Sequence, residues 1–255
     1  MNQQSRRQRM LEALNARGEV MIAPLARSLD VSEMTVRRDL DALAAAGKVI
    51  RTHGGATLAT RVAFEFNFMR KRHEQAAAKQ RIAARAAREI PPGASVLLDS
   101  GTTTLAVARA LRGRQNLRIL TTSLPIASEL QFTDHCELIL LGGTLRRESP
   151  DLIGPLTETN LENLRADLAF IGADAVDAAG YVYNQSLAVA RMLAKMTQAA
   201  QRVFILADQT KLDHTALARF GCLSAWDGLI TDAPARAAAL RPLRRAGIRI
   251  LSATH

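Results

Sequence analysis

The sequence predicts an α/β fold with two parts, an N-terminal winged helix-turn-helix and a doubly wound α/β domain. Two observations support this division. Up to Gln75 the pattern is that of short amphipathic helices, with 13 basic and 8 acidic residues. From Ala76 onward, short apolar runs alternate with helical patterns, which is typical of a parallel sheet with helices on both faces. We expect a first domain at 1–57, a linker at 58–75 and an α/β domain at 76–255.

Charge and composition narrow the classes of protein. The chain has 255 residues, of which 48% are hydrophobic, and its 34 basic and 24 acidic residues leave a net charge of +10. These values indicate a folded protein with a polyanionic partner, such as nucleic acid or a phosphorylated ligand. No signal-peptide pattern follows Met1 and no run of about 18 apolar residues occurs, so we expect a cytoplasmic protein that binds no membrane.

Metal and disulfide chemistry are not expected. Cys136 and Cys222 lie far apart and form no C-x-x-C pair, which excludes a disulfide framework and a cysteine-based zinc site. The 5 histidines are scattered without metal-ligand spacing. We therefore predict no metal, no cofactor and no catalytic residues.

Three short helices are expected in the N-terminal part. Residues 6–16 and 25–29 each place apolar side chains on one face. A third helix should begin at Ser32, whose hydroxyl suits an N-cap, and end at Ala46 before Gly47. Its inward face would carry Val36, Leu40 and Leu43.

The stretch after the third helix predicts a small hairpin. Residues 48–56 read Lys-Val-Ile-Arg-Thr-His-Gly-Gly-Ala, a strand-rich run into a glycine pair. Such a run after a helix-turn-helix is typical of a wing. In the linker that follows, Phe64, Phe66 and Phe68 alternate along the chain. We expect these rings to pack against a neighbouring surface, as aromatic side chains usually do.

Seven strands are expected in the second part, most of them separated by helices. An alanine-rich helix precedes the first strand. Most of the runs are short and apolar, as in strands that a parallel sheet buries on both faces. The expected strands lie at 95–98, 117–120, 137–141, 168–171, 202–207, 228–231 and 248–251.

The third helix carries a candidate for DNA binding. Its early residues and outer face gather polar and basic side chains, whereas its apolar residues face inward. A recognition helix presents its first turns to base edges and phosphates, and arginine suits both. The alternative is a solvated basic face on a packing helix. The candidate contacts are Ser32, Met34, Thr35, Arg37 and Arg38.

Three strings in this part resemble the DeoR-type bacterial transcriptional regulators, which respond to sugar phosphates. They begin at Arg9 (Arg-Met-x-x-Ala-Leu), at Val31 (Val-Ser-x-Met-Thr-Val-Arg-Arg-Asp-Leu) and at Arg51 (Arg-Thr-His-Gly-Gly-Ala). The resemblance continues to about Asp232. It implies that Thr35 and the arginine pair contact DNA. The wing that it implies adds Arg51, His53 and Gly54 to the candidate DNA contacts.

A second candidate site follows the strand expected at 95–98. Residues 98–105 read Leu-Asp-Ser-Gly-Thr-Thr-Thr-Leu and connect that strand to a helix. Backbone N–H groups and threonine hydroxyls at the positive end of a helix dipole suit a phosphate. Serine and threonine are also ordinary helix caps, so capping without a ligand is the alternative.

Polar residues also follow several other expected strands. The carboxyl ends of neighbouring parallel strands form the ligand crevice of an open α/β sheet, so these residues should converge. The resemblance implies the same, since the effector domain of that family is similar to the ribose-5-phosphate isomerase fold. Lys211 would bind a phosphate or pair with an aspartate, and a solvated loop lysine is the alternative. The expected effector-site residues are Asp99, Gly101, Thr102, Thr103, Thr104, Thr122, Gly142, Gly143, Asp174, Asp208 and Lys211.

Two other places bear on the ligand. Arg146 and Arg147 follow the glycine pair and suit either a phosphate or a surface or subunit contact. Where the family resemblance leads us to expect an acidic residue and then a lysine, this chain has Arg191 and Leu193, after a loop at 181–184. The identity of the ligand therefore does not transfer from familiar members of the family.

Two classes of function fit these patterns. The first is a repressor of sugar or polyol catabolic genes that binds double-stranded operator DNA and is released by a phosphorylated sugar or polyol. The second is a sugar-phosphate isomerase with a basic appendage, in which Asp174, Asp208 and Lys211 would perform acid–base steps. An isomerase needs no winged helix-turn-helix, so we favour the repressor. Helix-turn-helix proteins usually bind two half-sites of an operator, so we also expect a homo-oligomer, either a dimer or a tetramer.

Overall fold

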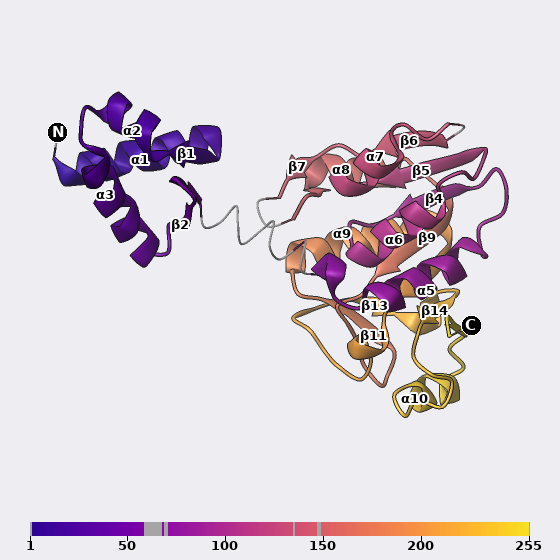
Figure 1. Ribbon diagram of the computed structural model, residues 1–255. Helices are drawn as coiled ribbons and strands as arrows, with labels where there is room; N and C mark the ends of the chain where they lie inside the picture. The colour runs from indigo at the N-terminus through magenta and orange to yellow at the C-terminus, as the bar shows by residue number, and fades with distance from the viewer. Residues whose placement is uncertain (1, 59–67, 69–70, 135, 147–148, 255) are drawn as a thin grey trace. The chain divides into compact units, whose positions relative to one another are not determined.

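The computed structural model describes residues 2–58, 68, 71–134, 136–146 and 149–254. The chain divides into two compact units, Met1–Arg70 and Lys71–His255 (Figure 1). Each unit has its own hydrophobic core. The expected packing of Phe64 and Phe66 lies outside the described residues, whereas Phe68 is half-buried.

The N-terminal unit is a helix-turn-helix followed by a hairpin, as predicted. Three antiparallel strands in the order β1-β3-β2 close it. Strand β1 is not among the expected elements, because one buried side chain between two exposed ones is too short a pattern to indicate a strand. The elements are α1 (Gln3–Arg17), β1 (Glu19–Met21), α2 (Ile22–Leu29), α3 (Glu33–Ala45), β2 (Val49–Thr52) and β3 (Gly55–Leu58).

Local signals set the two ends of α3. The Ser32 hydroxyl accepts a hydrogen bond from the Thr35 N–H at 3.2 Å, so Ser32 caps the helix as predicted. At the other end Gly47 has a φ of +67°, a left-handed conformation that glycine adopts without strain. The Lys48 N–H then returns to the Leu43 carbonyl, which satisfies one of the last free carbonyls of the helix.

A buried carboxylate fixes α3 against α1. Asp39 is 1% exposed and accepts hydrogen bonds from Arg6 Nε at 2.6 Å and from Arg7 Nε at 2.8 Å. Burial by itself would raise the pKa of Asp39, but the hydrogen bonds and charge of these arginines outweigh burial and hold the pKa below its ordinary value. Asp39 therefore anchors α3 and sets the orientation of its outer face, a role that the sequence did not suggest.

The second unit is built on a seven-stranded parallel sheet, which confirms the predicted α/β class. The strand order is β15-β14-β12-β9-β4-β5-β6. Every expected strand is present, with ends shifted by a residue or two. The last strand starts late because the Ile248 N–H bonds instead to the Leu243 carbonyl at the end of a helix. The strands are β4 (Ser95–Leu98), β5 (Leu117–Thr121), β6 (Cys136–Leu140), β9 (Ala166–Gly172), β12 (Ala200–Leu206), β14 (Gly228–Thr231) and β15 (Ile250–Ser252).

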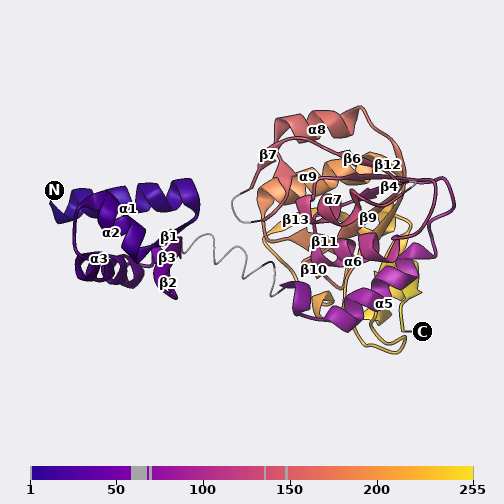
Figure 2. The same cartoon turned by 45° about the horizontal axis from the view of Figure 1, so that its top comes forward.

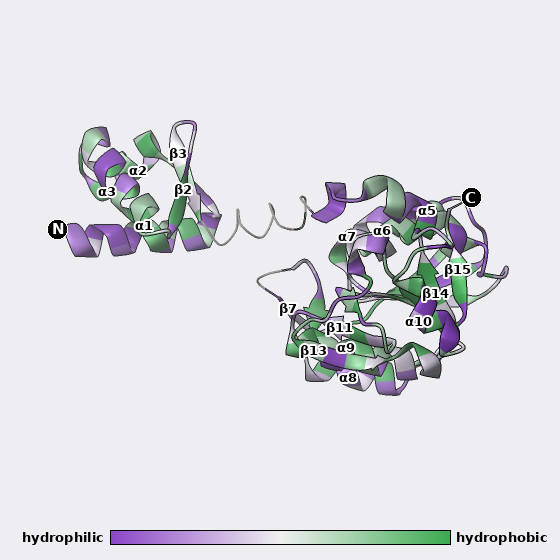
Figure 3. Cartoon of the chain, turned by 90° about the horizontal axis from the view of Figure 1, so that it is seen from below, coloured by the Kyte–Doolittle hydropathy of each residue, from purple (hydrophilic) through white to green (hydrophobic). Residues whose placement is uncertain are grey.

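Helices cover both faces of this sheet (Figure 2). Helices α8 and α9 lie on one side, and α5 and α6 lie on the other. The strands between them are apolar: Phe170 of β9 and Phe204 of β12 stack with ring centroids 5.5 Å apart, and Figure 3 shows β14 and β15 in the hydrophobic colour. The helices are α5 (Ala76–Ala87), α6 (Thr102–Ala110), α7 (Leu124–Leu130), α8 (Pro155–Glu162), α9 (Leu187–Gln198) and α10 (Leu240–Arg245). Within the described ranges no helix combines the length and the apolar character that crossing a membrane requires.

Two small antiparallel sheets are added to the loops of the parallel sheet. The prediction that residues 181–184 form a loop is wrong: this segment is strand β11, and its Val182 is fully buried. Its partners β10 and β13 lie on either side of it. Strand β10 forms a short antiparallel hairpin with it but has only two residues, and β13 lies far along the chain, so neither partner gives the long alternating run that indicates a strand. The added strands are β7 (Thr144–Leu145), β8 (Leu152–Ile153), β10 (Ala175–Val176), β11 (Tyr181–Asn184) and β13 (Ala218–Cys222).

We expect the Asp39→Asn variant to lower the free energy of unfolding of the N-terminal unit by about 1–3 kcal/mol at neutral pH, because two arginine donors lose their charged acceptor. The stabilisation by Asp39 is complete above the ordinary carboxyl pKa of 3.8 and disappears as the pH falls through the lower pKa of the folded state. The variant should lack this pH dependence. Calorimetric unfolding of both proteins from neutral pH to well below that value checks this.

The control is Asp41→Asn on the same helix. The Asp41 side chain is 65% exposed and pairs with Arg51 at the surface, so its loss should cost less stability. Equal unfolding free energies for the wild type and Asp39→Asn at neutral pH would contradict the anchoring role.

Candidate DNA interface and effector site

The start and outer face of α3 hold five of the residues predicted for DNA contact. Ser32, Arg37 and Arg38 are exposed, and Met34 is 59% exposed. Thr35 is half-buried, and its hydroxyl lies 2.9 Å from the Ser32 hydroxyl. A large apolar side chain beside basic ones at the start of a helix suits contact with base edges, since methionine fits the thymine methyl and arginine the guanine edge.

The two arginines of this face are available to a partner. Arg37 lies 3.6 Å from Glu33 one turn earlier, in an exposed pair of the kind that contributes little stability. Arg38 makes no ion pair within the described residues. Both guanidinium groups can therefore turn to a phosphate or a base edge at little cost.

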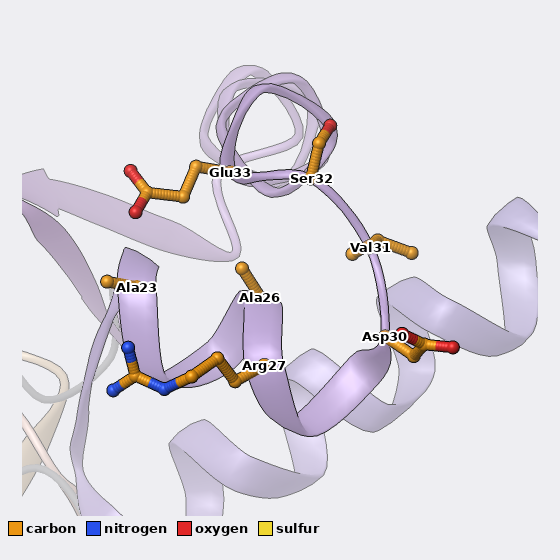
Figure 4. A pocket seen from close by; sticks show the side chains of 7 residues that line it. All are labelled: Ala23, Ala26, Arg27, Asp30, Val31, Ser32 and Glu33. Carbon is orange, nitrogen blue, oxygen red and sulfur yellow. The ribbon is translucent and has the colours of Figure 1, made fainter.

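A hollow lies between α2 and the start of α3 (Figure 4). Arg27 and Glu33 extend along the same side of it, and Ala23 and Ala26 keep the space between them free of bulk. Such a surface at the turn of a helix-turn-helix leaves room for the DNA backbone beside the recognition helix. The hollow is lined by Ala23, Ala26, Arg27, Asp30, Val31, Ser32 and Glu33.

The wing has an exposed tip and an anchored base. His53 and Gly54 form the tip and are exposed. Arg51 Nη1 pairs with Asp41 at 2.5 Å and donates to the Arg37 carbonyl at 3.2 Å. Arg51 therefore ties the hairpin to α3, a structural use that the sequence did not suggest beside its predicted contact with DNA.

In the second unit, Asp99 organises the turn after β4. Its carboxylate is 4% exposed and accepts hydrogen bonds from the Gly101 N–H at 2.9 Å, the Gly172 N–H at 2.8 Å and the Thr104 hydroxyl. Burial raises the pKa of Asp99 although these hydrogen bonds oppose the rise. Both carboxylate oxygens of Asp99 therefore accept hydrogen bonds from within the protein. Asp99 and Thr104 therefore shape the predicted site, and they join the end of β4 to the end of β9.

The first turn of α6 presents the other threonines of this motif. Gly101 is the N-cap, and Thr102 and Thr103 follow it in half-buried positions. The first N–H groups of a helix have no acceptor within the helix and carry the positive end of its dipole. The Thr102 hydroxyl also donates to the Lys71 carbonyl at 3.4 Å. These groups form an anion-favouring corner at the end of β4.

The ends of β9 and β12 reach the same corner. Asp174 follows β9, and its carboxylate lies 3.9 Å from Lys71 Nζ. Asp208 and Lys211 follow β12, and their charges act on the ammonium of Lys79. Lys79 in turn donates to the Lys71 carbonyl. We call Lys71, Lys79, Asp174, Asp208 and Lys211 the strand-end cluster; it gathers the ends of neighbouring strands, as the sequence predicts for an open α/β sheet.

Lys79 is a member of this cluster that sequence reasoning missed. It lies on α5, is 8% exposed, and its ammonium also donates to the Glu74 carbonyl at 2.7 Å. Desolvation lowers the pKa of Lys79; the charge of Asp208 opposes this and the charge of Lys211 adds to it. The signal that would have found it is a lysine on the buried, alanine-rich face of an amphipathic helix.

The remaining predicted residues lie at the ends of β5 and β6. Thr122 is fully buried, and among the described residues its hydroxyl is the one buried side-chain nitrogen or oxygen without a hydrogen-bond partner. Gly143 has a φ of +144°, and a Cβ there would lie 2.0 Å from the Thr157 hydroxyl. The Gly142 carbonyl accepts a hydrogen bond from that hydroxyl at 2.6 Å. The glycine pair therefore packs against α8, and within the described ranges no hydrogen bond joins it to the strand-end cluster.

A second buried carboxylate accounts for Arg146. Asp151 is fully buried and accepts hydrogen bonds from the Ser100 hydroxyl at 2.6 Å and from two nitrogens of Arg146 at 2.7 and 2.9 Å. Arg146 is thus engaged inside the protein, which does not favour a phosphate role for it. Arg147 lies outside the described residues.

Within the described residues, no hydrogen bond or ion pair joins the two residues that depart from the family pattern to this cluster. Arg191 pairs with Glu158 of α8 at 2.8 Å, and its side chain is 72% exposed. Leu193 is 1% exposed and belongs to the hydrophobic core. Both therefore serve the packing of α9.

Two protein-family models match this chain. The model of the DeoR-like helix-turn-helix domain matches residues 6–62, and that of the DeoR C-terminal sensor domain matches residues 74–233. The chain belongs to the DeoR family. The second match alone covers more than half of the chain, and together they confirm the resemblance seen in the sequence.

Relatives in the DeoR family carry the names of regulators. The chain is 32% identical over 234 residues to the glycerol-3-phosphate regulon repressor of Escherichia coli (strain K12), with 92% of each chain covered. It is 35% identical over 236 residues to the lactose phosphotransferase system repressor of Lactococcus lactis subsp. lactis, with 91% of this chain and 92% of that protein covered. This DeoR-family chain is therefore a transcriptional regulator, and the isomerase alternative is not supported.

Among solved structures, a remote likeness exists to ribose 5-phosphate isomerase A from Methanocaldococcus jannaschii. It has a TM-score of 0.41 and 17% sequence identity, and it covers 54% of each chain. A likeness at this level transfers no activity to the DeoR-family chain.

We expect the Asp99→Asn variant to lower the free energy of unfolding of the sensor unit by about 1–3 kcal/mol. The side-chain NH2 group of asparagine would replace one carboxylate oxygen, so a donor that now meets an acceptor would face another donor. Amide hydrogen exchange in the first turn of α6 should become faster. Hydrogen-exchange mass spectrometry of the full chain measures this.

Asp177→Asn is the matched control, because Asp177 also accepts three hydrogen bonds, from the Ala179 N–H, the Tyr181 N–H and the Tyr183 hydroxyl. It should loosen the turn before β11 and leave the start of α6 unchanged. If Asp99→Asn leaves exchange in α6 at the wild-type rate, the organising role of Asp99 is wrong.

Proposed function

We propose that this chain is a repressor of sugar or polyol catabolic genes that leaves its operator when a phosphorylated sugar or polyol binds the sensor unit. The observation that carries this proposal is that one DeoR-family chain combines an exposed basic face on α3 with the strand-end cluster. The relatives named for the glycerol-3-phosphate regulon and the lactose phosphotransferase system support this class of gene.

In the DNA-binding half of this proposal, α3 enters the major groove. Its first turns carry the exposed residues Ser32, Met34, Arg37 and Arg38, so these meet base edges and phosphates, with Thr35 beside them. The exposed wing tip at His53 and Gly54 meets the DNA backbone. Arg51 holds the wing in place for that contact and adds positive charge near the phosphates.

In the effector half, the phosphate group lies at the first turn of α6. The N–H groups and hydroxyls of Thr102 and Thr103 donate to it, and Lys211 supplies positive charge. Asp174 and Asp208 accept hydrogen bonds from sugar hydroxyls, since ionised carboxylates are acceptors only. The Thr122 hydroxyl supports a polar ligand, because leaving a buried hydroxyl without a partner costs about 1–3 kcal/mol that a ligand would recover.

The proposed repressor acts as a homo-oligomer on a two-fold operator. One recognition helix reads only a few base pairs, so two copies on two half-sites give the affinity and specificity that an operator requires. A dimer satisfies this geometry, and a tetramer satisfies it for two operators.

We expect Arg37→Ala plus Arg38→Ala to weaken binding to the upstream region of the protein's own gene, by about 1–3 kcal/mol for each base-edge hydrogen-bonding pair that the substitutions remove. A gel-shift titration at several salt concentrations measures the affinity and its salt dependence. The matched control is Arg241→Ala plus Arg245→Ala, which removes the same charge from exposed positions on α10 of the sensor unit. Equal effects of the two double variants would refute the assignment to α3.

We expect at least one compound to bind in a calorimetric panel of phosphorylated sugars and polyols, without being converted to product. Thr102→Ala plus Thr103→Ala, and Lys211→Ala, should each weaken that binding about tenfold or more, since each removes a charge-assisted contact worth about 1.5–3 kcal/mol.

Two controls accompany this panel. Thr159→Ala plus Thr197→Ala removes two hydroxyls from α8 and α9, and Lys195→Ala removes a lysine that pairs with Glu162 there. Both should bind the compound like the wild type. Turnover of a compound at an enzyme-like rate would support the isomerase alternative instead. If the Thr102 and Thr103 substitutions leave the binding affinity unchanged, the proposed phosphate site is wrong.

A further inference from the structure

Lys79 places a buried positive charge where the sensor unit begins. Its ammonium donates to the carbonyls of Lys71 and Glu74, and Lys71 is the first residue of that unit. Lysine is rarely buried to this degree without a charged partner. Among the described residues Lys79 makes no ion pair, so two backbone carbonyls hold its charge. The first residues of the sensor unit are thus held by one buried ammonium.

Two further contacts hold Lys71 in the same place. The Thr102 hydroxyl donates to the Lys71 carbonyl at 3.4 Å, so that carbonyl has donors from both α5 and α6. The Lys71 ammonium lies 3.9 Å from the Asp174 carboxylate after β9. We call these contacts of Lys71 and Glu74 with Lys79, Thr102 and Asp174 the entry clamp. Every side chain that makes it belongs to the strand-end cluster or to the first turn of α6.

The charges around Lys79 favour replacing its carbonyl acceptors with an anion. The charged groups that act on Lys79 are Asp208 and Glu74, which are negative, and Lys211 and Lys71, which are positive. Desolvation lowers the pKa of Lys79, which shows that its surroundings do not fully compensate its charge. A phosphate carries a full negative charge that the two carbonyls lack, so its Coulomb attraction to a desolvated ammonium exceeds theirs. An anion beside Lys79 would therefore compete well with the two carbonyls.

We propose that Lys79 couples the effector site to the DNA-binding unit: a phosphate at the start of α6 takes the Lys79 ammonium and the Thr102 hydroxyl from the Lys71 carbonyl and so opens the entry clamp. This inference rests on the proposed function and adds the route by which the ligand acts. Lys79 is a positioning residue in the free protein and a ligand contact in the bound one.

Opening the clamp changes the connection between the two units. The chain before Lys71 leads to the DNA-binding unit, so residues 71–74 become part of that connection once they leave the sensor surface. A longer connection costs more free energy to order when two recognition helices must engage one operator at fixed spacing. Ligand binding and operator binding are then opposed, which is the differential affinity that an allosteric coupling requires.

The decisive variant is Lys79→Met, which keeps the length and the buried apolar stem of the side chain and removes the ammonium. Its matched control is Lys195→Met, at the α8–α9 contact. Thr102→Val, which removes the second donor to the Lys71 carbonyl, is the milder variant if Lys79→Met fails to fold. Because it also removes a proposed phosphate contact, its operator affinity and cleavage rate are compared with the wild type in the absence of probes. The full chain is used throughout, with glycerol 3-phosphate, fructose 6-phosphate and inorganic phosphate as probes.

Two readouts are needed. The first is operator affinity with and without each probe. The second is the rate of tryptic cleavage after Lys71 and Arg72, since proteolysis reports how often a segment opens. Without any probe, Lys79→Met should bind operator more weakly than the wild type by most of the factor that the best probe causes, typically about 5–150-fold. Its cleavage should be about tenfold faster or more, and a probe should add little to either effect.

The outcomes separate this inference from the proposed function. Cleavage at the wild-type rate in Lys79→Met, or full response of its operator affinity to a probe that releases the wild type, would overturn the coupling and leave the repressor intact. A probe that binds the wild type and releases DNA without faster cleavage after Lys71 would do the same. A wild type that binds none of the probes and is released by none would contradict the proposed function along with the coupling.

Discussion

The parallel direction of the seven strands is the constraint on which the rest of the sensor unit depends. Because all strands point the same way, every loop that follows a strand lies at one edge of the sheet. Buried carboxylates then join those loops: Asp99 joins the end of β4 to that of β9, and Asp232 after β14 accepts the Gln209 N–H after β12 at 2.9 Å and pairs with Arg81 of α5 at 2.8 Å. The strand-end cluster lies among these loops.

The DNA-contact motif and the phosphate-loop motif each contain two kinds of residue: some bond within the protein and hold the fold, and others are left exposed or at a helix start. In the Arg-Arg-Asp run of α3, Asp39 points inward to two arginines of α1 while Arg37 and Arg38 stay exposed. In the turn after β4, Asp99 and Thr104 bond to each other and leave the preceding two threonines at the helix start. A motif string thus gives candidate contacts, and the structure shows which of them are already engaged within the protein.

The sequence predicted the helix ends and the parallel strands because their signals are local. Ser32 and Gly47 act through neighbours a few residues away, and the buried strands are continuous apolar runs. Features that depend on distant partners could not be predicted in this way. Strand β11 pairs along its whole length with the distant β13, whereas only two of its residues pair with the neighbouring β10. Asp39 meets arginines of another helix, and Lys79 meets carbonyls at the start of the unit. The place of Lys79 on the alanine-rich face of α5 indicates burial, but nothing local indicates which carbonyls hold its charge.

The central claim is that a phosphorylated ligand bound to the sensor unit weakens operator binding by the DNA-binding unit of the same chain. Linkage requires the effect to be reciprocal: if the ligand weakens operator binding by a given factor, the operator weakens ligand binding by that same factor. Calorimetric titration of the ligand into the free protein and into the saturated operator complex measures this directly. The account predicts a ligand affinity about 5–150-fold lower in the complex. Equal affinities in the two titrations would contradict it.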